Sequence, residues 1–193
     1  MKPMPATAKG RRSRIAIVEA AAGLMHDQGI AGTPIDDVLT ASGTGKSQLY
    51  HYFDGKQDLT VAVLYHQLDR VLDSQPSLRD PDCTDLRRWR DEVLHAHHRN
   101  HFGNCPLGVF AGQVGDDPVL RQELAGLFDQ WQQAIAGLVT RAVAAGRVHP
   151  DTDPVSTALA LLTALQGGTM LGCLRGSEHP LAEAIDRVLS TIS

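Results

Sequence analysis

Two short stretches of the chain concentrate side chains whose types and spacing allow chemistry. The first is SGTGKSQLYHYF at residues 42–53, where a Gly-Lys-Ser sequence typical of a phosphate-binding loop precedes hydrogen-bond donors and aromatic rings. The second is HAHHRNH at residues 95–101, which places imidazoles at helical spacing with Cys105 close behind. The first stretch is a candidate phosphate-binding site, of a nucleotide or of a nucleic acid, and the second is a candidate metal site.

The nucleotide interpretation of the first stretch fails on two counts. A nucleotide-binding loop needs a further glycine five residues before its Gly-Lys-Ser, and a strand must lead into it. The position five residues before Gly45 is Thr40, and the preceding residues have a helical pattern. Thr33 is placed to cap that helix and Pro34 to open it. We therefore exclude a nucleotide-binding loop.

The same residues fit two short helices joined by a tight glycine turn, which is the helix-turn-helix arrangement. Residues 34–41 would form the first helix and residues 46–53 the second. Leu49 and Phe53 lie one helical turn apart and would face inward. The remaining polar and aromatic side chains would then project outward, where they suit a major groove and its flanking phosphates. These are Lys46, Ser47, Gln48, Tyr50 and His51.

Charge is distributed unevenly along the 193 residues, although the net charge is only −4. Residues 1–60 hold seven Lys and Arg against six acids, whereas the remaining 133 residues hold eleven Arg against sixteen acids. Every lysine lies within the first 56 residues. This asymmetry indicates a polyanionic partner at the N-terminal end.

Helical patterns run through the whole chain, and no alternating pattern predicts a strand. We expect an all-α fold of about nine helices, one of them a short piece at residues 105–115, with caps at Thr84, Asp117 and Asp153. The apolar run at residues 155–174 contains Ser, Thr, Gln and Gly, so it indicates a helix packed in protein, not a membrane span. Three unpaired cysteines and no visible signal peptide favour a soluble, cytoplasmic protein.

Residues 33–59, TPIDDVLTASGTGKSQLYHYFDGKQDL, resemble the DNA-binding signature of tetracycline-repressor (TetR) family regulators. The resemblance extends over about residues 12–60. It implies an all-α homodimer with a three-helix DNA-binding head and a larger helical body that holds a small ligand. We expect the basic arm and DNA-binding domain at residues 1–58 and the ligand-binding and dimerisation domain at residues 59–193.

The resemblance also implies which residues contact DNA. Ser47 and Gln48 would read bases, and Lys46 would reach a base or a phosphate. Two positions depart from the family pattern, because Thr44 replaces the usual apolar residue and Gly45 the usual serine cap. The full set of expected DNA contacts is Arg11, Arg12, Arg14, Thr33, Thr44, Lys46, Ser47, Gln48, Tyr50, His51 and Lys56.

The body resembles one branch of the family, the LmrA-like drug- and flavonoid-responsive repressors, at residues 104–131 and 160–171. That likeness implies a small, largely apolar organic effector, and the last two helices would form the homodimer interface. Packing in the core is the competing explanation for each candidate ligand contact. These candidates are Trp89, Val93, His97, Leu107, Phe110, Phe128, Trp131, Gln166 and Met170.

The histidine-rich stretch supports an alternative function, a metal- or redox-sensing regulator or a helical metalloprotein. The residues concerned are His95, His97, His98, His101 and Cys105. The spacing allows metal binding, but no carboxylate lies at ligand spacing, so we expect no metal. No carboxylate pair or Ser-His-Asp set stands out either, so we expect no enzyme, no catalytic residue and no cofactor. The favoured function is a repressor that releases a palindromic double-stranded DNA operator when its effector binds, without a membrane partner.

Overall fold

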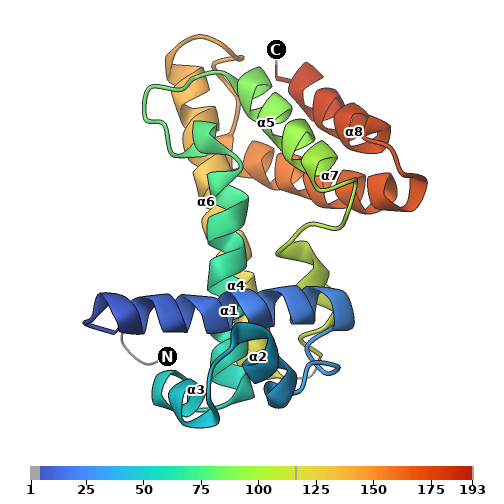
Figure 1. Cartoon of the computed structure of the whole chain (residues 1–193). Coiled ribbons are helices and arrows are strands. Elements are labelled where there is room, and N and C mark those ends of the chain that lie inside the picture. The colour runs from blue at the N-terminus through green and yellow to red at the C-terminus, as the bar shows by residue number, and fades with distance from the viewer. Residues whose placement is uncertain (1–4, 116, 193) are drawn as a thin grey trace. The chain divides into compact units, whose positions relative to one another are not determined.

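The computed structural model of the chain describes residues 5–115 and 117–192. These residues form eight α-helices and two short 3-10 helices, and no strand occurs among them (Figure 1). The α-helices are α1 (Ala8–Gln28), α2 (Ile35–Ser42), α3 (Lys46–Tyr52), α4 (Lys56–Asp73), α5 (Leu86–Arg99), α6 (Pro118–Ala144), α7 (Pro154–Arg175) and α8 (His179–Ser190). The 3-10 helices are η1 (Pro76–Leu78) and η2 (Gly108–Gly112).

The all-α prediction is confirmed, but the expected number of helices was one too high. Residues 105–115 form only the short helix η2 and turns, where an additional helix was expected. Pro106, Gly108 and Gly112 explain the difference, because proline and glycine are the poorest formers of a continuous α-helix.

The helices group into two compact units. The first contains the chain up to Asp69 together with residues 109–127, and the second contains residues 70–108 and those from Phe128 onward. Helices α4 and α6 therefore each contribute residues to both units. The functional division expected between residues 58 and 59 stays a prediction.

The core of the first unit is built by one face of α1 against α2 and α3. Ile17, Ala21 and Met25 follow at four-residue spacing on α1, and all three have no exposed surface. Leu49 on α3 and Phe53 directly after it are likewise fully buried, as their spacing predicted. The short helices thus gain their stability from packing, since seven or eight residues are too few for a stable isolated helix.

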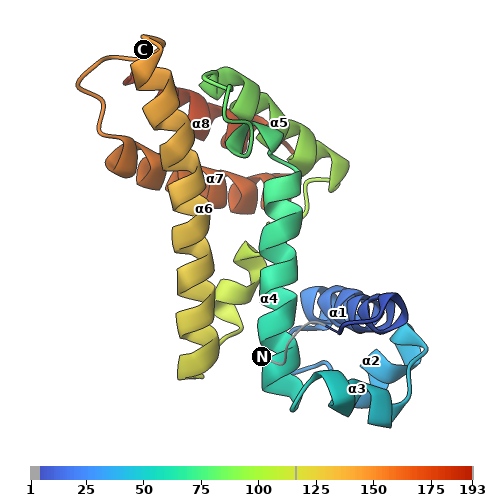
Figure 2. The ribbon, with the colours of Figure 1, turned by 90° about the vertical axis from the view of Figure 1, so that its left-hand side faces the viewer.

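In the second unit, α7 and α8 lie side by side, and α5 also packs against α8 (Figures 1 and 2). Glycine permits the close approach of α7 and α8, because a Cβ atom on Gly168 would lie 2.6 Å from the Leu181 Cα atom. By length and composition α7 is apolar enough to cross a membrane, with 44% of its apolar window buried in the protein. Its packing on α8 fits the expected helix within a protein.

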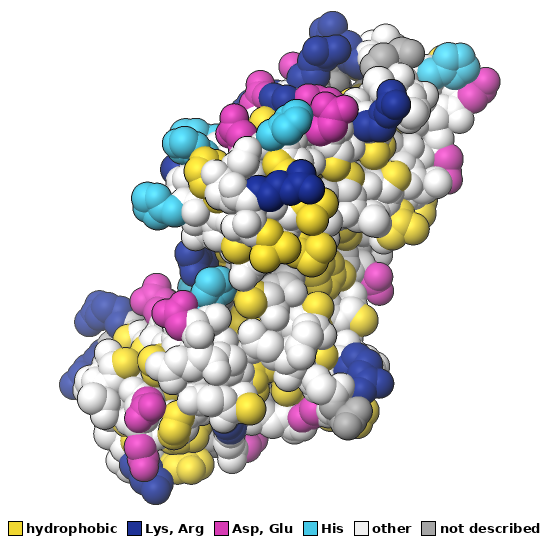
Figure 3. Space-filling view, turned by 90° about the vertical axis from the view of Figure 1, so that its right-hand side faces the viewer, with side chains coloured by type: hydrophobic (Ala, Val, Ile, Leu, Met, Phe, Trp, Pro, Cys, Tyr) yellow, Lys and Arg dark blue, Asp and Glu magenta, His cyan; other side chains and the backbone are white. Residues whose placement is uncertain are grey.

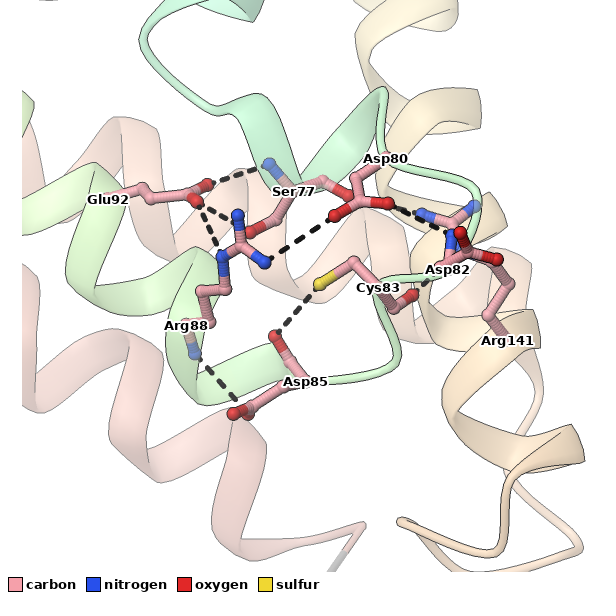
Figure 4. A network of polar contacts seen from close by, with 8 residues as sticks. All are labelled: Ser77, Asp80, Asp82, Cys83, Asp85, Arg88, Glu92 and Arg141. Carbon is pink, nitrogen blue, oxygen red and sulfur yellow. Dashed lines mark hydrogen bonds and ion pairs between the residues drawn. The ribbon is translucent and has the colours of Figure 1, made fainter.

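A polar network holds the connection between α4 and α5 (Figure 4). The Glu92 carboxylate accepts hydrogen bonds from the Ser77 backbone N–H at 3.0 Å and from its hydroxyl at 2.6 Å. The Arg141 guanidinium donates to the carbonyls of Cys83 and Ser77, and Arg88 pairs with Glu92. This connection, expected only as a helix break, is therefore held by helices α5 and α6.

Capping explains where several helices begin. Asp117 and Asp153 accept hydrogen bonds from the first backbone N–H groups of α6 and α7, as predicted. The prediction for α5 was wrong by one residue, because Asp85 caps the helix and not Thr84. The prediction for α2 was also wrong, since Thr33 does not cap the helix. Its hydroxyl donates a hydrogen bond to the Gly29 carbonyl instead.

Candidate DNA-binding surface and ligand cavity

The turn between α2 and α3 is fixed by its backbone and by one side-chain contact. Gly43 ends α2 with φ of 64°, a left-handed conformation that favours glycine. Its N–H donates to carbonyls of the last turn of α2. The hydroxyls of Ser42 and Thr44 share a hydrogen bond of 2.8 Å. Thr44, which departs from the family pattern, is half-buried, and its hydrogen bond with Ser42 helps to hold the turn in one conformation.

Helix α3 has one buried face and one polar face. Leu49 and Tyr52 point into the unit and are buried. No side chain caps the start of α3 at Gly45. The opposite face carries the donors and rings that the sequence predicted to face outward. Of these, Lys46, Ser47, Tyr50 and His51 are exposed, and Gln48 is half-buried.

The basic N-terminal segment is helical from Ala8, with the Thr7 hydroxyl accepting a hydrogen bond from the Gly10 N–H at 3.1 Å. Arg12 is exposed and forms no ion pair with any residue that the structure describes. Arg11 is also exposed, and its guanidinium donates to the carbonyls of residues 5 and 6. Residues 1–4, where the expected basic arm begins, lie outside the described residues.

Arg14 differs from its basic neighbours, because only 8% of it is exposed. Its guanidinium carbon lies 5.1 Å from the centre of the Phe53 ring. Burial lowers the pKa of Arg14, and the carboxylate of Asp58 opposes that shift. A side chain packed in this way is not presented to DNA. Its burial therefore argues against the predicted contact, and we leave Arg14 out of the proposed set.

Two further predicted DNA contacts are engaged inside the protein. Thr33 is 1% exposed, and its hydroxyl donates to the Gly29 carbonyl at 2.8 Å. A buried hydroxyl with a backbone partner is not presented to a phosphate, so we leave Thr33 out as well. Lys56 is half-buried and its amino group donates to the Ala31 carbonyl at 3.3 Å. Because an ammonium has three donors, Lys56 retains capacity for a phosphate.

A cavity of about 440 Å³ lies within the second unit. It is formed by the end of α4, by α5 and the loop after it, and by α6 and α7. A cavity of this size suits a small organic ligand. Its lining residues are Arg70, Val71, Asp73, Ser74, Gln75, Val93, Ala96, His97, Arg99, Asn100, Gly103, Asn104, Cys105, Pro106, Trp131, Leu165 and Thr169.

The structure brings Val93, His97 and Trp131 to the cavity out of the nine predicted ligand contacts. The other six lie elsewhere. Trp89, Leu107 and Phe110 are fully buried in the packing. Phe128 stacks on the Trp131 ring at 6.0 Å between centroids, Gln166 donates to the Cys105 sulfur, and Met170 is 56% exposed. None of these six residues lines the cavity, so none is placed to contact a ligand bound there.

The contribution of α4 and of the residues directly after it, above all Gln75, was not predicted from the sequence. Its side-chain oxygen accepts from the indole N–H of Trp89 at 2.8 Å and from that of Trp131 at 3.3 Å. Buried tryptophans usually find an acceptor, so two central tryptophans were a signal to look for one. The partner was not identifiable from the sequence, because it lies 14 and 56 residues away along the chain.

The histidine-rich stretch does not form a metal site. Within residues 5–115 and 117–192, no group of three or more His, Cys, Asp or Glu is placed to hold a metal ion. The histidines visible in Figure 3 are scattered over the face shown. His97 is buried and lies edge-to-face with Phe102, whereas His95, His98 and His101 are exposed. The metal-dependent alternative is therefore not favoured.

Cys105 is buried at the cavity, where it accepts a hydrogen bond from the Gly108 N–H at 3.3 Å. Burial raises the pKa of the Cys105 thiol, and hydrogen bonds from Gly108, Gln166 and Leu107 only partly oppose this. A thiol that stays protonated at neutral pH is a poor nucleophile. The redox-sensing alternative is therefore not favoured either.

Comparison with known proteins agrees with this arrangement over most of the chain. Residues 17–63 match the family model described as "Bacterial regulatory proteins, tetR family". Residues 76–188, more than half of the chain, match the one described as "Tetracyclin repressor-like, C-terminal domain". The chain belongs to the tetracycline-repressor (TetR) family. Neither description names the LmrA-like branch, so membership of that branch stays a prediction.

Relatives within the TetR family cover nearly the whole chain. An HTH-type transcriptional regulator of Mycobacterium tuberculosis is 30% identical over 185 residues, covering 90% of this chain and 89% of its own. The transcriptional regulator AcuR of Cereibacter sphaeroides is 29% identical over 171 residues, covering 83% of this chain and 77% of its own. The crystal structure of a TetR regulatory protein from Rhodobacter sphaeroides has a TM-score of 0.80 at 22% identity, covering 94% and 99% of the two chains. At that identity the likeness concerns the fold.

TetR-family proteins are ligand-responsive transcriptional regulators, typically repressors, and not enzymes. They bind operator DNA and act as dimers. The predicted family and the predicted DNA-binding, ligand-responsive function are thereby confirmed for this chain.

Proposed function

We propose that this TetR-family protein represses transcription in the cytoplasm by inserting α3 into the major groove of a palindromic operator. The observation that carries the proposal is the polar outer face of α3, set on a turn fixed by Gly43 and Thr44. Gln48 and Ser47 read base edges, and Lys46 contacts a base or a phosphate. The remaining residues of the proposed set contact the DNA backbone. They are Arg11, Arg12, Thr44, Tyr50, His51 and Lys56.

A dimer would place two α3 helices in successive major grooves on one side of the duplex. We infer that the chains associate through α7 and α8. On α7, Val155, Leu159, Met170 and Leu174 are 61%, 53%, 56% and 78% exposed, and they recur at helical spacing along one face. Figure 3 shows hydrophobic side chains reaching the surface beside charged ones on the face it displays. Burial of this α7 face in a second copy would remove it from water.

The effector would bind in the cavity of the second unit. Helix α4 lines that cavity with residues 70, 71 and 73, and its preceding turns belong to the unit that carries α3. Helix α6 contributes Trp131 to the cavity and residues 118–127 to the first unit. An effector that binds more tightly to the arrangement of these helices that does not fit the operator lowers operator affinity. The decrease is set by the difference between the effector's affinities for the two arrangements.

Operator binding tests the proposal directly. The purified protein should retard DNA from upstream of its own gene in a gel-shift assay, at low and moderate salt, in preference to unrelated DNA. The Gln48→Ala variant should bind about 5–150-fold more weakly, the loss expected for one good contact with a base. Its helix content, measured by circular dichroism, should not change.

The matched control is Gln133→Ala, which removes an exposed glutamine on α6 that belongs to the second unit. This variant should bind the operator like the parent protein. Equal affinities of Gln48→Ala and the parent would reject the assignment of α3, and absence of any sequence-specific shift would reject the operator-binding function.

A further inference from the structure

The charged groups around the cavity leave it with a positive balance. Arg70, Arg99 and Asp73 are its charged lining residues. The Asp73 carboxylate is already paired with the guanidinium of Arg79, which is not part of the lining. Arg99 is exposed and has no hydrogen bond or ion pair with any residue in the described part of the chain. A cationic ligand would therefore meet no unpaired carboxylate here, whereas an anion would meet the Arg99 guanidinium.

Two largely buried side chains of the lining hold hydrogen-bond donors that have no partner in the described part of the chain. The Gln75 oxygen is occupied by two indole N–H groups, which can only donate, so the other end of its amide must be the NH₂ group. That NH₂ group makes no hydrogen bond with a described residue, and Gln75 is only 4% exposed. Thr169, 6% exposed, lines the same cavity, and its hydroxyl likewise has no partner within the described ranges.

Apolar surface makes up another part of the lining. Val93 on α5, Trp131 on α6 and Leu165 on α7 are each at least nine-tenths buried and face the same cavity. A ligand that fills it must therefore combine an apolar body with acceptor atoms. Without acceptors, the NH₂ group of Gln75 and the hydroxyl of Thr169 would be left buried and unpaired on binding, which weakens affinity.

We propose that the effector is an organic carboxylate with a compact apolar body and one further acceptor atom. The carboxylate binds Arg99 where the cavity meets solvent, so it keeps part of its hydration. The body lies against Trp131 and Leu165, and the further acceptor, a carbonyl or hydroxyl oxygen, takes a hydrogen bond from Gln75. This inference rests on the proposed role of the cavity as the effector site.

Three matched probes test the inference by titration calorimetry on the full chain. They are 4-oxo-4-phenylbutanoate, its primary amide, and 4-phenylbutanoate, which lacks the ketone oxygen. The keto acid should bind at least about tenfold more tightly than its amide, because a charged acceptor gains more from a guanidinium than a neutral one. It should also bind several-fold more tightly than 4-phenylbutanoate, because only the ketone satisfies Gln75.

Variants then assign the charge effect to one residue. Arg99→Gln should weaken binding of the keto acid by about tenfold and leave binding of its amide unchanged. The control Arg87→Gln removes an exposed arginine of the same helix that does not line this cavity, and it should change neither affinity. Equal affinities for acid and amide, no effect of Arg99→Gln, or no binding of any probe at millimolar concentration would each overturn the proposal.

These outcomes are distinct from failure of the proposed function. A neutral ligand could instead release the operator, and Leu165→Trp, which fills the cavity, could abolish that release. This result would support the cavity as the effector site but exclude a carboxylate as the effector. Equal affinities for the keto acid and 4-phenylbutanoate would reject the role of Gln75. Loss of operator binding by Gln48→Ala is independent of all three probes.

Discussion

Arg14 shows how one helical position changes the role of a basic residue. Its neighbours Arg11 and Arg12 are exposed, but Arg14 lies on the buried face of α1, in register with Val18 and Ala21. Packing over the Phe53 ring gives the guanidinium a favourable contact with a π-face in place of water. A basic residue near the start of this chain is therefore part of the core that supports α3.

At the residue scale, His97 predicts a pH dependence of stability. Burial lowers the pKa of His97 from its ordinary value of 6.5, and the Glu178 carboxylate opposes this shift. Below about pH 6.5 the unfolded chain therefore binds more protons at His97 than the folded protein does. The contribution of neutral His97 to the free energy of unfolding is therefore complete well above that pH. It decreases as pH falls, by at most about 1.4 kcal/mol per pH unit.

Urea unfolding between about pH 7.5 and about pH 5.5 measures this dependence. The His97→Gln variant should lose part of the decrease in unfolding free energy on acidification, whatever its stability at neutral pH. His95→Gln, which changes an exposed histidine of the same helix, is the control and should keep the slope of the parent. Identical slopes for His97→Gln and the parent would contradict the prediction.

At the scale of elements, the pairing of α7 with α8 depends on a glycine. A Cβ atom at Gly168 would lie 2.6 Å from the Leu181 Cα atom and 3.1 Å from one of its methyl carbons. Backbone cannot move away as a flexible side chain can, so the two helices would have to separate. Gly168→Ala should therefore lower the free energy of unfolding by about 1–3 kcal/mol, although alanine is the better helix former.

The control for this substitution is Gly126→Ala on α6, where an added Cβ atom has nothing within 4 Å. There the change should raise the free energy of unfolding by about 0.5–1 kcal/mol, the ordinary gain for alanine inside a helix. Chemical denaturation of both variants gives opposite signs if the α7–α8 contact is as close as described. Stabilisation by Gly168→Ala would show that the helices have room for a methyl group.

At the scale of the whole molecule, the exposed apolar face of α7 predicts how two chains associate. Met170→Asp places a charge on that face without touching the core, because Met170 is 56% exposed. Burying an unpaired carboxylate in an interface is unfavourable, so the dimer should dissociate into chains of 20.8 kDa. Light scattering coupled to size-exclusion chromatography measures the mass, and operator affinity should fall with it.

Val119→Asp serves as the control for the dimer prediction, since Val119 is 45% exposed on α6 and does not belong to the α7 face. Its mass should equal that of the parent protein. A dimer that survives Met170→Asp, Leu159→Asp and Leu174→Asp would place the interface on another surface.

The sequence by itself determined the local features, because these depend on residues close together in the chain. The glycine turn at residues 43–45, the inward Leu49 and Phe53, and the caps Asp117 and Asp153 follow from helical spacing and backbone preferences. A long continuous motif of this kind was sufficient to predict the family and the DNA-binding function. Single caps such as Thr84 and Thr33 were wrong, because Asp85 caps α5 and the Thr33 hydroxyl bonds to the Gly29 carbonyl instead.

Only the tertiary structure decided which residues share the cavity. Gln75 meets Trp89 and Trp131, and Asp73 is neutralised by Arg79, through contacts that no local pattern encodes. Hydrophobic spacing marks a residue as buried but does not distinguish a core from a cavity wall, so Trp89 and Phe110 were predicted as ligand contacts although they pack in the core. The polar lining, and with it the chemistry of the proposed effector, arises because α4, α5, α6 and α7 converge there.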